Sequence, residues 1–164
     1  MVYITFCYGQ LYRKINNYEE AIRYFDNTLK SCIQGSDMYF ASVYNKCMCN
    51  INAREFPNAK IILENVKKVC GTHELWSIYF KTLEYFLTLS CQMTSKNDEA
   101  VEYIESVSIP HYLKHYDYSF ALECYRLLEQ HFMQTRRKKR SWGMTKLILD
   151  VYIRGFTNNE EVFK

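Results

Sequence analysis

Apolar positions recur along this chain every three to four residues, a spacing that places them on one face of an α-helix. In residues 2–15 they stand at positions 4, 8, 11, 12 and 15, and in residues 18–32 at positions 21, 22, 25 and 29. The same spacing recurs in six further segments, 38–52, 57–70, 74–93, 98–107, 118–135 and 142–154. The pattern predicts eight helices arranged as four antiparallel pairs.

Turn and cap residues set the bounds of the first helices. Asn16 and Asn17 form a turn signal, and Gly35 ends the first pair. Asp37 is the expected cap of the third helix, and Pro57 fits a first helical turn, where its missing N–H is not needed. Gly71 stops that helix.

Similar signals mark the second half of the chain. Pro110 is expected to break the chain after a helix that Asp98 opens, and Asp117 caps the helix that follows. Gly155 is expected to end the last helix, leaving residues 156–164 as a frayed tail.

A short unit recurs three times: an aromatic or polar residue, two residues, Ala, three residues and a large apolar residue. Its alanines are Ala21, Ala59 and Ala100, followed by Phe25, Leu63 and Ile104. A repeat at about 40 residues is typical of stacked helical hairpins, which work by presenting a surface. This pattern favours a binding module over an enzyme.

Composition agrees with long helices joined by short loops. The chain has 164 residues, 48% of them hydrophobic, with only 5 Gly and 2 Pro. The net charge of +3 does not by itself predict nucleic-acid binding. No apolar run reaches the roughly 20 residues that span a bilayer, and no signal-peptide pattern follows Met1.

Seven cysteines, an odd number, lie mostly within apolar helical segments, at positions 7, 32, 47, 49, 70, 91 and 124. This arrangement favours reduced, buried thiols in a cytoplasmic protein over a disulfide framework.

The first repeat resembles the tetratricopeptide repeat family, through Gly9, Tyr12, Tyr18, Ala21 and Phe25. In such a repeat the small residues let two helices approach while the aromatic ones fill the space beside them. The later repeats match less well, and in the fourth Trp142, Thr145 and Leu149 occupy the motif positions. The resemblance implies a single domain over 1–155, a right-handed superhelical solenoid of about four hairpins, with repeats at about 3–34, 38–71, 74–109 and 117–155.

Long repeat spacings and a composition rich in Tyr, Asn and Lys narrow the resemblance to the C-terminal repeat domains of bacterial peptide-pheromone receptors of the Rap, NprR, PlcR and PrgX type. That family implies quorum sensing and transcriptional regulation through a groove that binds a short signalling peptide, without a cofactor. DNA would be bound only through a separate N-terminal domain that this chain does not carry.

Alignment with the repeat places nine residues on the concave, peptide-binding face: Phe6, Gln10, Arg13, Tyr44, Asn45, Met48, Thr82, Tyr85 and Leu89. Amide side chains suit an extended backbone because they both donate and accept hydrogen bonds. Arg13 could pair with a peptide carboxylate. The alternative interpretation is that these nine residues contact no ligand and are ordinary exposed or packing residues.

The last helix offers apolar residues with no following repeat to cover them, which predicts a homodimer through Leu147, Ile148, Val151 and Phe156. Two other functions stay open. One is a constitutive scaffold whose groove holds a protein tail, and the other is a nucleic-acid regulator acting through the basic run 136–140.

Other chemistry is weakly supported. The basic run Arg136–Arg140 is more simply explained as a solvated turn.

His111 and His115 share a helix face without a nearby ligand cluster, so no metal site is expected. Cys47 and Cys49 lack the spacing of a zinc or redox motif. Cys124 and His131 lack a third, orienting group, and no catalytic motif is present, so no catalysis is expected.

Overall fold

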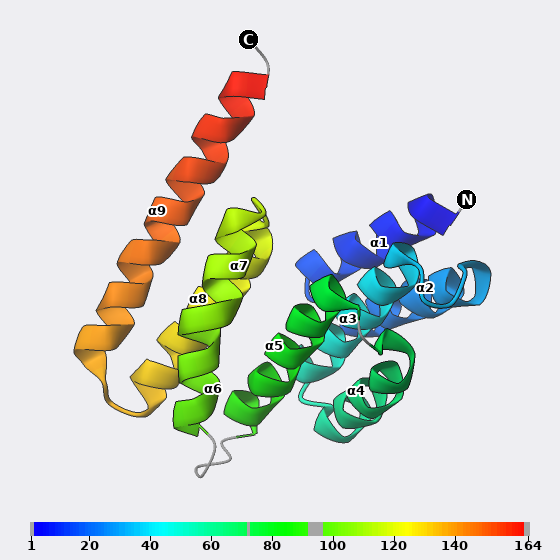
Figure 1. Cartoon of the computed structure of the whole chain (residues 1–164), viewed down its shortest axis with the longest axis horizontal. Coiled ribbons are helices and arrows are strands. Elements are labelled where there is room, and N and C mark those ends of the chain that lie inside the picture. The colour runs from blue at the N-terminus through cyan, green and yellow to red at the C-terminus, as the bar shows by residue number, and fades with distance from the viewer. Residues whose placement is uncertain (1, 72, 92–96, 163–164) are drawn as a thin grey trace. The chain divides into compact units, whose positions relative to one another are not determined.

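The computed structural model describes residues 2–71, 73–91 and 97–162, with side chains described as far as residue 154. Within these ranges the chain folds into helices and contains no strand (Figure 1). The predicted all-α class is therefore confirmed. The chain divides into two compact units, Met1–Cys91 and Gln92–Lys164, called here unit 1 and unit 2. The prediction of a single repeat domain stays a prediction.

Unit 1 contains five helices among its described residues, with bounds close to those predicted. They are α1 (Val2–Lys14), α2 (Tyr18–Ser31), α3 (Asp37–Asn52), α4 (Phe56–Cys70) and α5 (Glu74–Ser90). Helix α3 is central, because it contacts α1, α2, α4 and α5. Most of its length is buried, which explains why its apolar residues occur on more than one face.

An aromatic cluster joins α3 to α5 in the core of unit 1. The ring of Phe40 lies 5.7 Å from Trp76 and 5.9 Å from Phe80. The indole N–H of Trp76 donates a 2.8 Å hydrogen bond to Oδ1 of Asp37. Asp37 is therefore not the cap of α3. The hydroxyl oxygen of Ser36 fills that role, accepting from the backbone N–H of Tyr39 at 3.2 Å.

Unit 2 begins with a continuous helical run and ends with two long helices. The run comprises α6 (Asn97–Tyr103), the π-helical turn η2 (Ile104–Ser108) and α7 (Ile109–Lys114). It is followed by α8 (Tyr118–Gln134) and α9 (Lys138–Val162), and α8 packs against both α7 and α9. The third predicted helix pair is thus divided, since α5 belongs to unit 1 and α6 to unit 2.

Pro110 does not break the chain, contrary to prediction. It lies in the first turn of α7, directly after η2, where the N–H of Ile109 bonds the carbonyl of Ile104. Proline lacks the N–H that would bond the carbonyl four residues earlier, and its ring crowds that carbonyl. The wider π-helical turn gives this ring room, so the helix continues to Lys114.

Gly155 does not end the last helix either, since α9 continues to Val162. The predicted tail at 156–164 is therefore helical up to residue 162. Glycine inside a helix costs only about 1 kcal/mol relative to alanine, so without a proline or a competing cap it does not stop a long helix.

The four short turns that the structure describes between α1 and α2, α3 and α4, α7 and α8, and α8 and α9 share one geometry. Each contains a residue with left-handed φ between 58° and 62°, namely Asn16, Arg54, Tyr116 and Arg136. The next N–H then bonds the carbonyl five residues back at 2.8–2.9 Å. This is the Schellman arrangement that closes a helix C-terminus.

After each of these turns, the helix places a small residue in its first turns, at a helix crossing. These residues are Ala21, Ala59, Ala121 and Ser141, with exposed fractions of 0–2%. Ala100, in the third copy of the sequence repeat, is also fully buried. The sequence repeat revealed three of these five positions. It placed the fourth repeat one residue too late, because Trp142 and Leu149 are 75% and 61% exposed while Ser141 is buried.

Candidate functional site

Most residues predicted for the peptide-binding face are buried. Phe6 lies 5.8 Å from Phe25, Tyr44 lies 5.9 Å from Tyr79, and the hydroxyl of Thr82 donates to its own helix. Seven are buried: Phe6, Tyr44, Asn45, Met48, Thr82, Tyr85 and Leu89. Gln10 and Arg13 are half-buried. A peptide-binding role for the nine stays a prediction.

A cleft of about 570 Å³ opens elsewhere in unit 1, between α2 and α4, with the C-terminal half of α3 contributing to its wall. Its apolar part consists of three isoleucines, Ile22 from α2 and Ile61 and Ile62 from α4. Ile61 is 55% exposed although isoleucine is usually buried. The cleft is lined by Tyr18, Glu19, Ile22, Lys46, Asn50, Ala53, Glu55, Asn58, Ile61 and Ile62.

Polar groups surround the isoleucines and give the cleft a net negative charge. The ammonium group of Lys46 lies 2.6 Å from the carboxylate of Asp26, which neutralises it. Glu19 and Glu55 add two carboxylates with no ion-pair partner among the described residues. Asn50 is buried and fixed by a 2.8 Å hydrogen bond from Nδ2 to the carbonyl of Lys46. The cleft therefore combines an aliphatic surface with carboxylates and amides.

Sequence analysis did not find this cleft, although one signal was available. The buried stripe of α4 consists of Ala59, Leu63, Val66 and Cys70. Ile61 lies off that stripe, on the exposed side of an amphipathic helix, where a polar residue is the usual choice.

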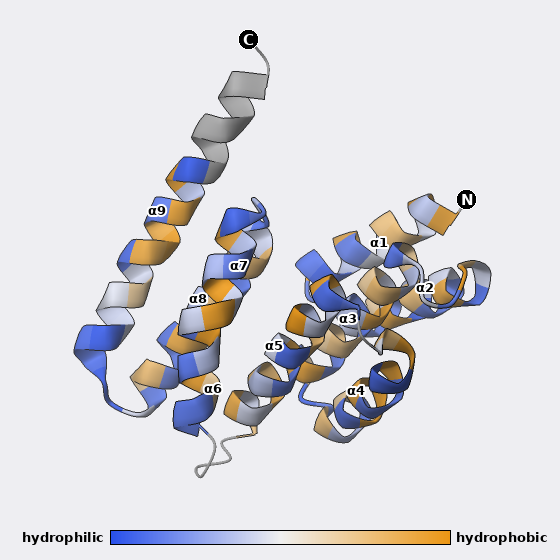
Figure 2. Cartoon of the chain, in the orientation of Figure 1, coloured by the Kyte–Doolittle hydropathy of each residue, from blue (hydrophilic) through white to orange (hydrophobic). Residues whose placement is uncertain are grey.

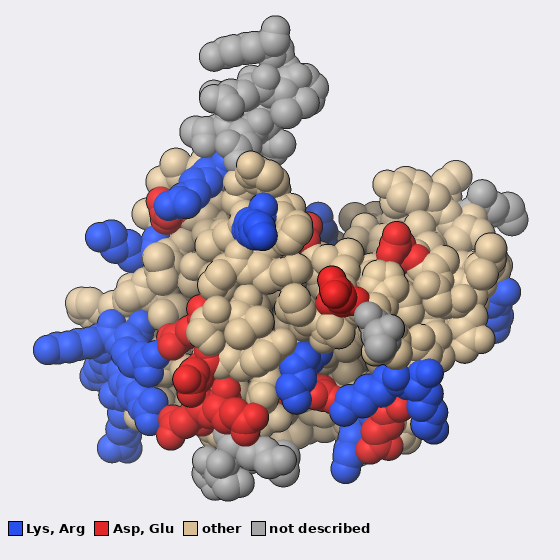
Figure 3. All heavy atoms as spheres, viewed as in Figure 1, with Lys and Arg blue, Asp and Glu red and all other residues tan. Residues whose placement is uncertain are grey.

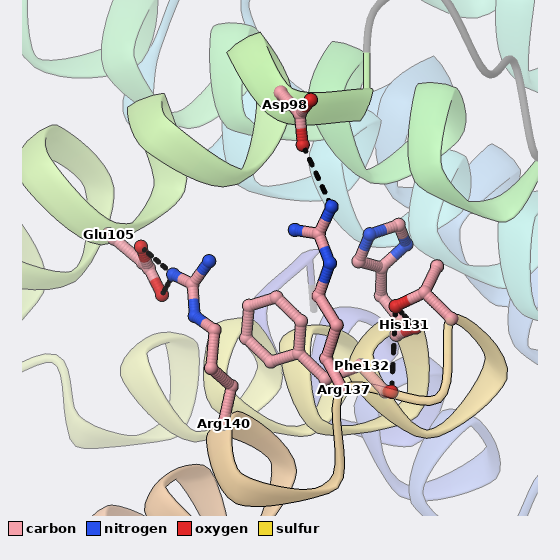
Figure 4. A network of polar contacts seen from close by, with 7 residues as sticks. Asp98, Glu105, His131, Phe132, Arg137 and Arg140 are labelled. Atoms are coloured by element: carbon pink, nitrogen blue, oxygen red, sulfur yellow. Dashed lines mark hydrogen bonds and ion pairs between the residues drawn. The ribbon is translucent and has the colours of Figure 1, made fainter.

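The basic run makes ion pairs within unit 2. The guanidinium of Arg137 lies 3.5 Å from the Asp98 carboxylate, and that of Arg140 makes two 2.7 Å hydrogen bonds to Glu105 (Figure 4). The Arg140 guanidinium also lies over the ring of Phe132, 4.3 Å from its centroid. Basic and acidic side chains accordingly adjoin on this surface (Figure 3). The two ion-paired arginines are less available for phosphate.

A second, smaller hollow of about 320 Å³ lies beside these ion pairs. It is lined by Asp98, Val101, Glu102, Glu105, Ser106 and Arg140. Its one arginine is already held by Glu105 in the bidentate contact described above. The hollow is thus an acidic groove at the surface of α6 and η2, without a buried polar group directed into it.

The cysteines are thiols in varied surroundings, and only some match the prediction of burial. Four are buried, Cys47, Cys49, Cys70 and Cys124, while Cys7 is exposed. Burial raises the pKa of Cys47 to about 12. Burial also raises the pKa of Cys124 well above its usual value. A nucleophilic cysteine needs a lowered pKa, so these thiols are poorly suited to catalysis.

The histidines match the sequence analysis in position. The rings of His111 and His115 lie 4.5 Å apart, on one face of α7 and its C-cap. Burial and the neighbouring His115 lower the pKa of His111, and burial lowers that of His131. Within the described residues no three side chains of the metal-binding types form a cluster. Nor is any described helix long and apolar enough to cross a bilayer.

The predicted dimer residues lie mostly on the inner side of α9. Val151 is 3% exposed within unit 2, Ile148 is half-buried, and Leu147 is 39% exposed. Phe156 lies outside the described side chains. The more exposed apolar residues of α9 lie on the side opposite Val151 and are Trp142, Leu149 and Ile153, at 75%, 61% and 54%. A dimer through α9 would use these residues instead of Val151.

Comparisons with protein-family models, curated protein sequences and solved structures give no match to this chain.

Proposed function

We propose that this chain is a non-catalytic binding module that holds a short, extended peptide segment in the cleft between α2 and α4. The observation that carries the proposal is the exposed isoleucine surface bordered by the carboxylates of Glu19 and Glu55. The predicted regulatory setting, peptide sensing linked to transcription, stays a prediction.

The arrangement of unit 1 supports a repeat architecture. Helices α1, α3 and α5 contact one another in sequence, α1 with α3 and α3 with α5, as the first helices of stacked hairpins do. The right-handed solenoid is part of this proposal. In such a stack, neighbouring second helices, here α2 and α4, leave a furrow between them, and the cleft occupies that furrow.

The chemistry of the cleft specifies its ligand. Ile22, Ile61 and Ile62 would cover an aliphatic side chain, and the two carboxylates would pair with an adjacent Lys or Arg. The amide of Asn58 can both donate to and accept from an extended backbone. The preferred ligand is a peptide with a large aliphatic residue next to a basic one.

The test is fluorescence anisotropy with a labelled library of short peptides in which an aliphatic residue adjoins Lys or Arg. We expect saturable binding that Ile61→Asp weakens by roughly tenfold or more, because a carboxylate replaces the apolar contact. Ile33→Asp is the matched control, since Ile33 is 82% exposed and does not line the cleft. Binding that is absent, or equally strong in Ile61→Asp, contradicts the proposal.

A second pair of variants tests the charge preference. Replacing Glu19 and Glu55 by Gln should remove the preference for Lys or Arg while leaving aliphatic recognition in place. Glu64→Gln, a change at an exposed residue of α4 outside the cleft, should have no effect. If only a folded partner protein binds, and it still requires Ile61, the scaffold alternative replaces the peptide receptor.

A further inference from the structure

Helix α1 has apolar residues on both of its faces. One face carries Phe6 and Gly9, which are buried against α2. Away from that face, Ile4, Tyr8 and Leu11 of α1, with Ile15 directly after its end, are 61%, 49%, 53% and 61% exposed, and the Tyr8 ring also stacks on Tyr24 of α2 at 5.5 Å. Their spacings of four, three and four residues place them in one unbroken stripe, called here the α1 stripe.

The exposed side of α1 has the composition of a protein core. Residues 2–12 contain no charged side chain, and Arg13 and Lys14 occupy only the last turn. Figure 2 shows this distribution, with strongly hydrophilic colouring at the C-terminal end of α1. A surface helix normally places charged residues on the side opposite its buried face. The α1 stripe departs from that rule along its whole length.

We propose that two copies of this chain associate through the α1 stripe, with the two α1 helices antiparallel across a twofold axis. The spacing of the stripe is symmetric about the point between Tyr8 and Leu11. In an antiparallel pair, Ile4 therefore faces Ile15 of the partner subunit, and Tyr8 faces Leu11 of the partner subunit. The stripe is complementary to itself, as an isologous interface requires.

The charges fit this arrangement. The antiparallel register sets Lys14 opposite Thr5 of the partner subunit, so the two basic ends lie at opposite extremes of the interface. A parallel pair would instead bring both Arg13–Lys14 ends together. Like charges at one end of a largely apolar contact oppose association.

The exposed area is sufficient for a small dimer. Tyr3, at the edge of the stripe, is 67% exposed and enlarges it. Large apolar side chains at these fractions expose on the order of 100 Å² each, or about 500–600 Å² per copy. Pairing would then bury about 1,000–1,200 Å² in total, at the lower end of the range for stable complexes.

The second copy is favoured over other occupants. The exposed side of α9 is interrupted by Lys146, between Trp142 and Leu149, and is a poorer match for an uncharged stripe. Pairing of α1 with α9 of another copy would be heterologous and would continue into larger assemblies. Helices that lie on lipid surfaces carry Lys and Arg along their polar face, which α1 lacks over residues 2–12.

The experiment is sedimentation equilibrium of the full chain over a wide concentration range, without added peptide. We expect a monomer–dimer equilibrium that Leu11→Glu weakens by about 30-fold or more, as loss of a central apolar contact does. Leu149→Glu is the matched control, since Leu149 is 61% exposed on α9, and it should leave the dimer intact. A chain that stays monomeric, that forms open-ended polymers, or that dissociates only in Leu149→Glu overturns the proposal.

A pair of double variants tests the antiparallel register. It also distinguishes loss of association from misfolding, which Leu11→Glu alone does not. The double variant Ile4→Glu/Ile15→Lys should keep the dimer, because each Glu then faces a Lys of the other copy. The double variant Ile4→Glu/Ile15→Glu should be monomeric. If both variants are equally weakened while their helical circular dichroism is retained, the register is wrong. These residues lie outside the cleft, so the outcome is independent of peptide binding.

Discussion

Single residues decide how closely the first two helices approach. Gly9 faces the fully buried ring of Phe25, and a Cβ atom built on Gly9 would lie 2.7 Å from that ring. The sequence analysis expected Gly9 to allow a close approach of the two helices and Phe25 to fill the space beside it, and the structure places the two residues in contact. Small and large residues alternate where helices cross at close range.

Replacing Gly9 by Ala should therefore destabilise the chain by about 1–3 kcal/mol, because the fully buried ring of Phe25 must shift to admit the new methyl group. Gly143→Ala is the control, since nothing lies within 4 Å of a Cβ built there. That change should stabilise α9 by about 0.5–1 kcal/mol, the gain of alanine over glycine in a helix. Urea denaturation measures both. Equal effects of the two changes on the free energy of unfolding would show that the close contact with Phe25 does not affect stability.

At the scale of elements, the turns carry strain that the sequence does not disclose. Arg54 and Arg136 adopt a left-handed φ that favours glycine, yet both are arginine. Helices still end there because the Schellman hydrogen bonds and the packing of the following helix hold the turn. The bounds of the long helices could be predicted from periodicity. The continuation through Pro110 could not, because a π-helical turn leaves no mark in a pattern counted at 3.6 residues.

Arg54→Gly should stabilise unit 1 by roughly 0.5–1 kcal/mol, since glycine adopts the left-handed conformation without a steric penalty. Asn16→Gly should change stability less, because asparagine tolerates this conformation better than arginine. Thermal unfolding of the two variants beside the parent chain checks the order. A loss of stability in Arg54→Gly would mean that the arginine side chain contributes more than its backbone strain costs.

At the scale of the molecule, the candidate site was harder to predict than the fold. The peptide-facing residues taken from the repeat pattern assume that first helices expose their concave side. Here most of those residues are buried, and aromatic side chains of α3 contact those of α5, Phe40 with Trp76 and Phe80 and Tyr44 with Tyr79. Exposed apolar surface is found instead on α4 and α1, where Ile61 and the α1 stripe depart from the buried pattern.

Unit 1 has a core of its own, which the aromatic cluster and the α1–α2 contact build without residues from beyond Cys91. A fragment of residues 1–91 should therefore fold cooperatively by itself. Circular dichroism and dispersed amide NMR signals would check this expectation. A fragment that stays unfolded would show that unit 1 depends on the remainder of the chain.

The π-helical turn at Ile104–Ser108 gives the helical run 97–114 one residue more than an α-helix of the same length would use. Buried residues continue on both sides of it, at Ala100 and Val101 before and at Ile109 and Tyr112 after. The turn can therefore lose one residue without changing the register of the helices on either side. Loss of one residue there would convert a π-turn to an α-turn and leave the flanking buried residues in register, whereas the same loss inside α3 would rotate half of its core contacts out of place.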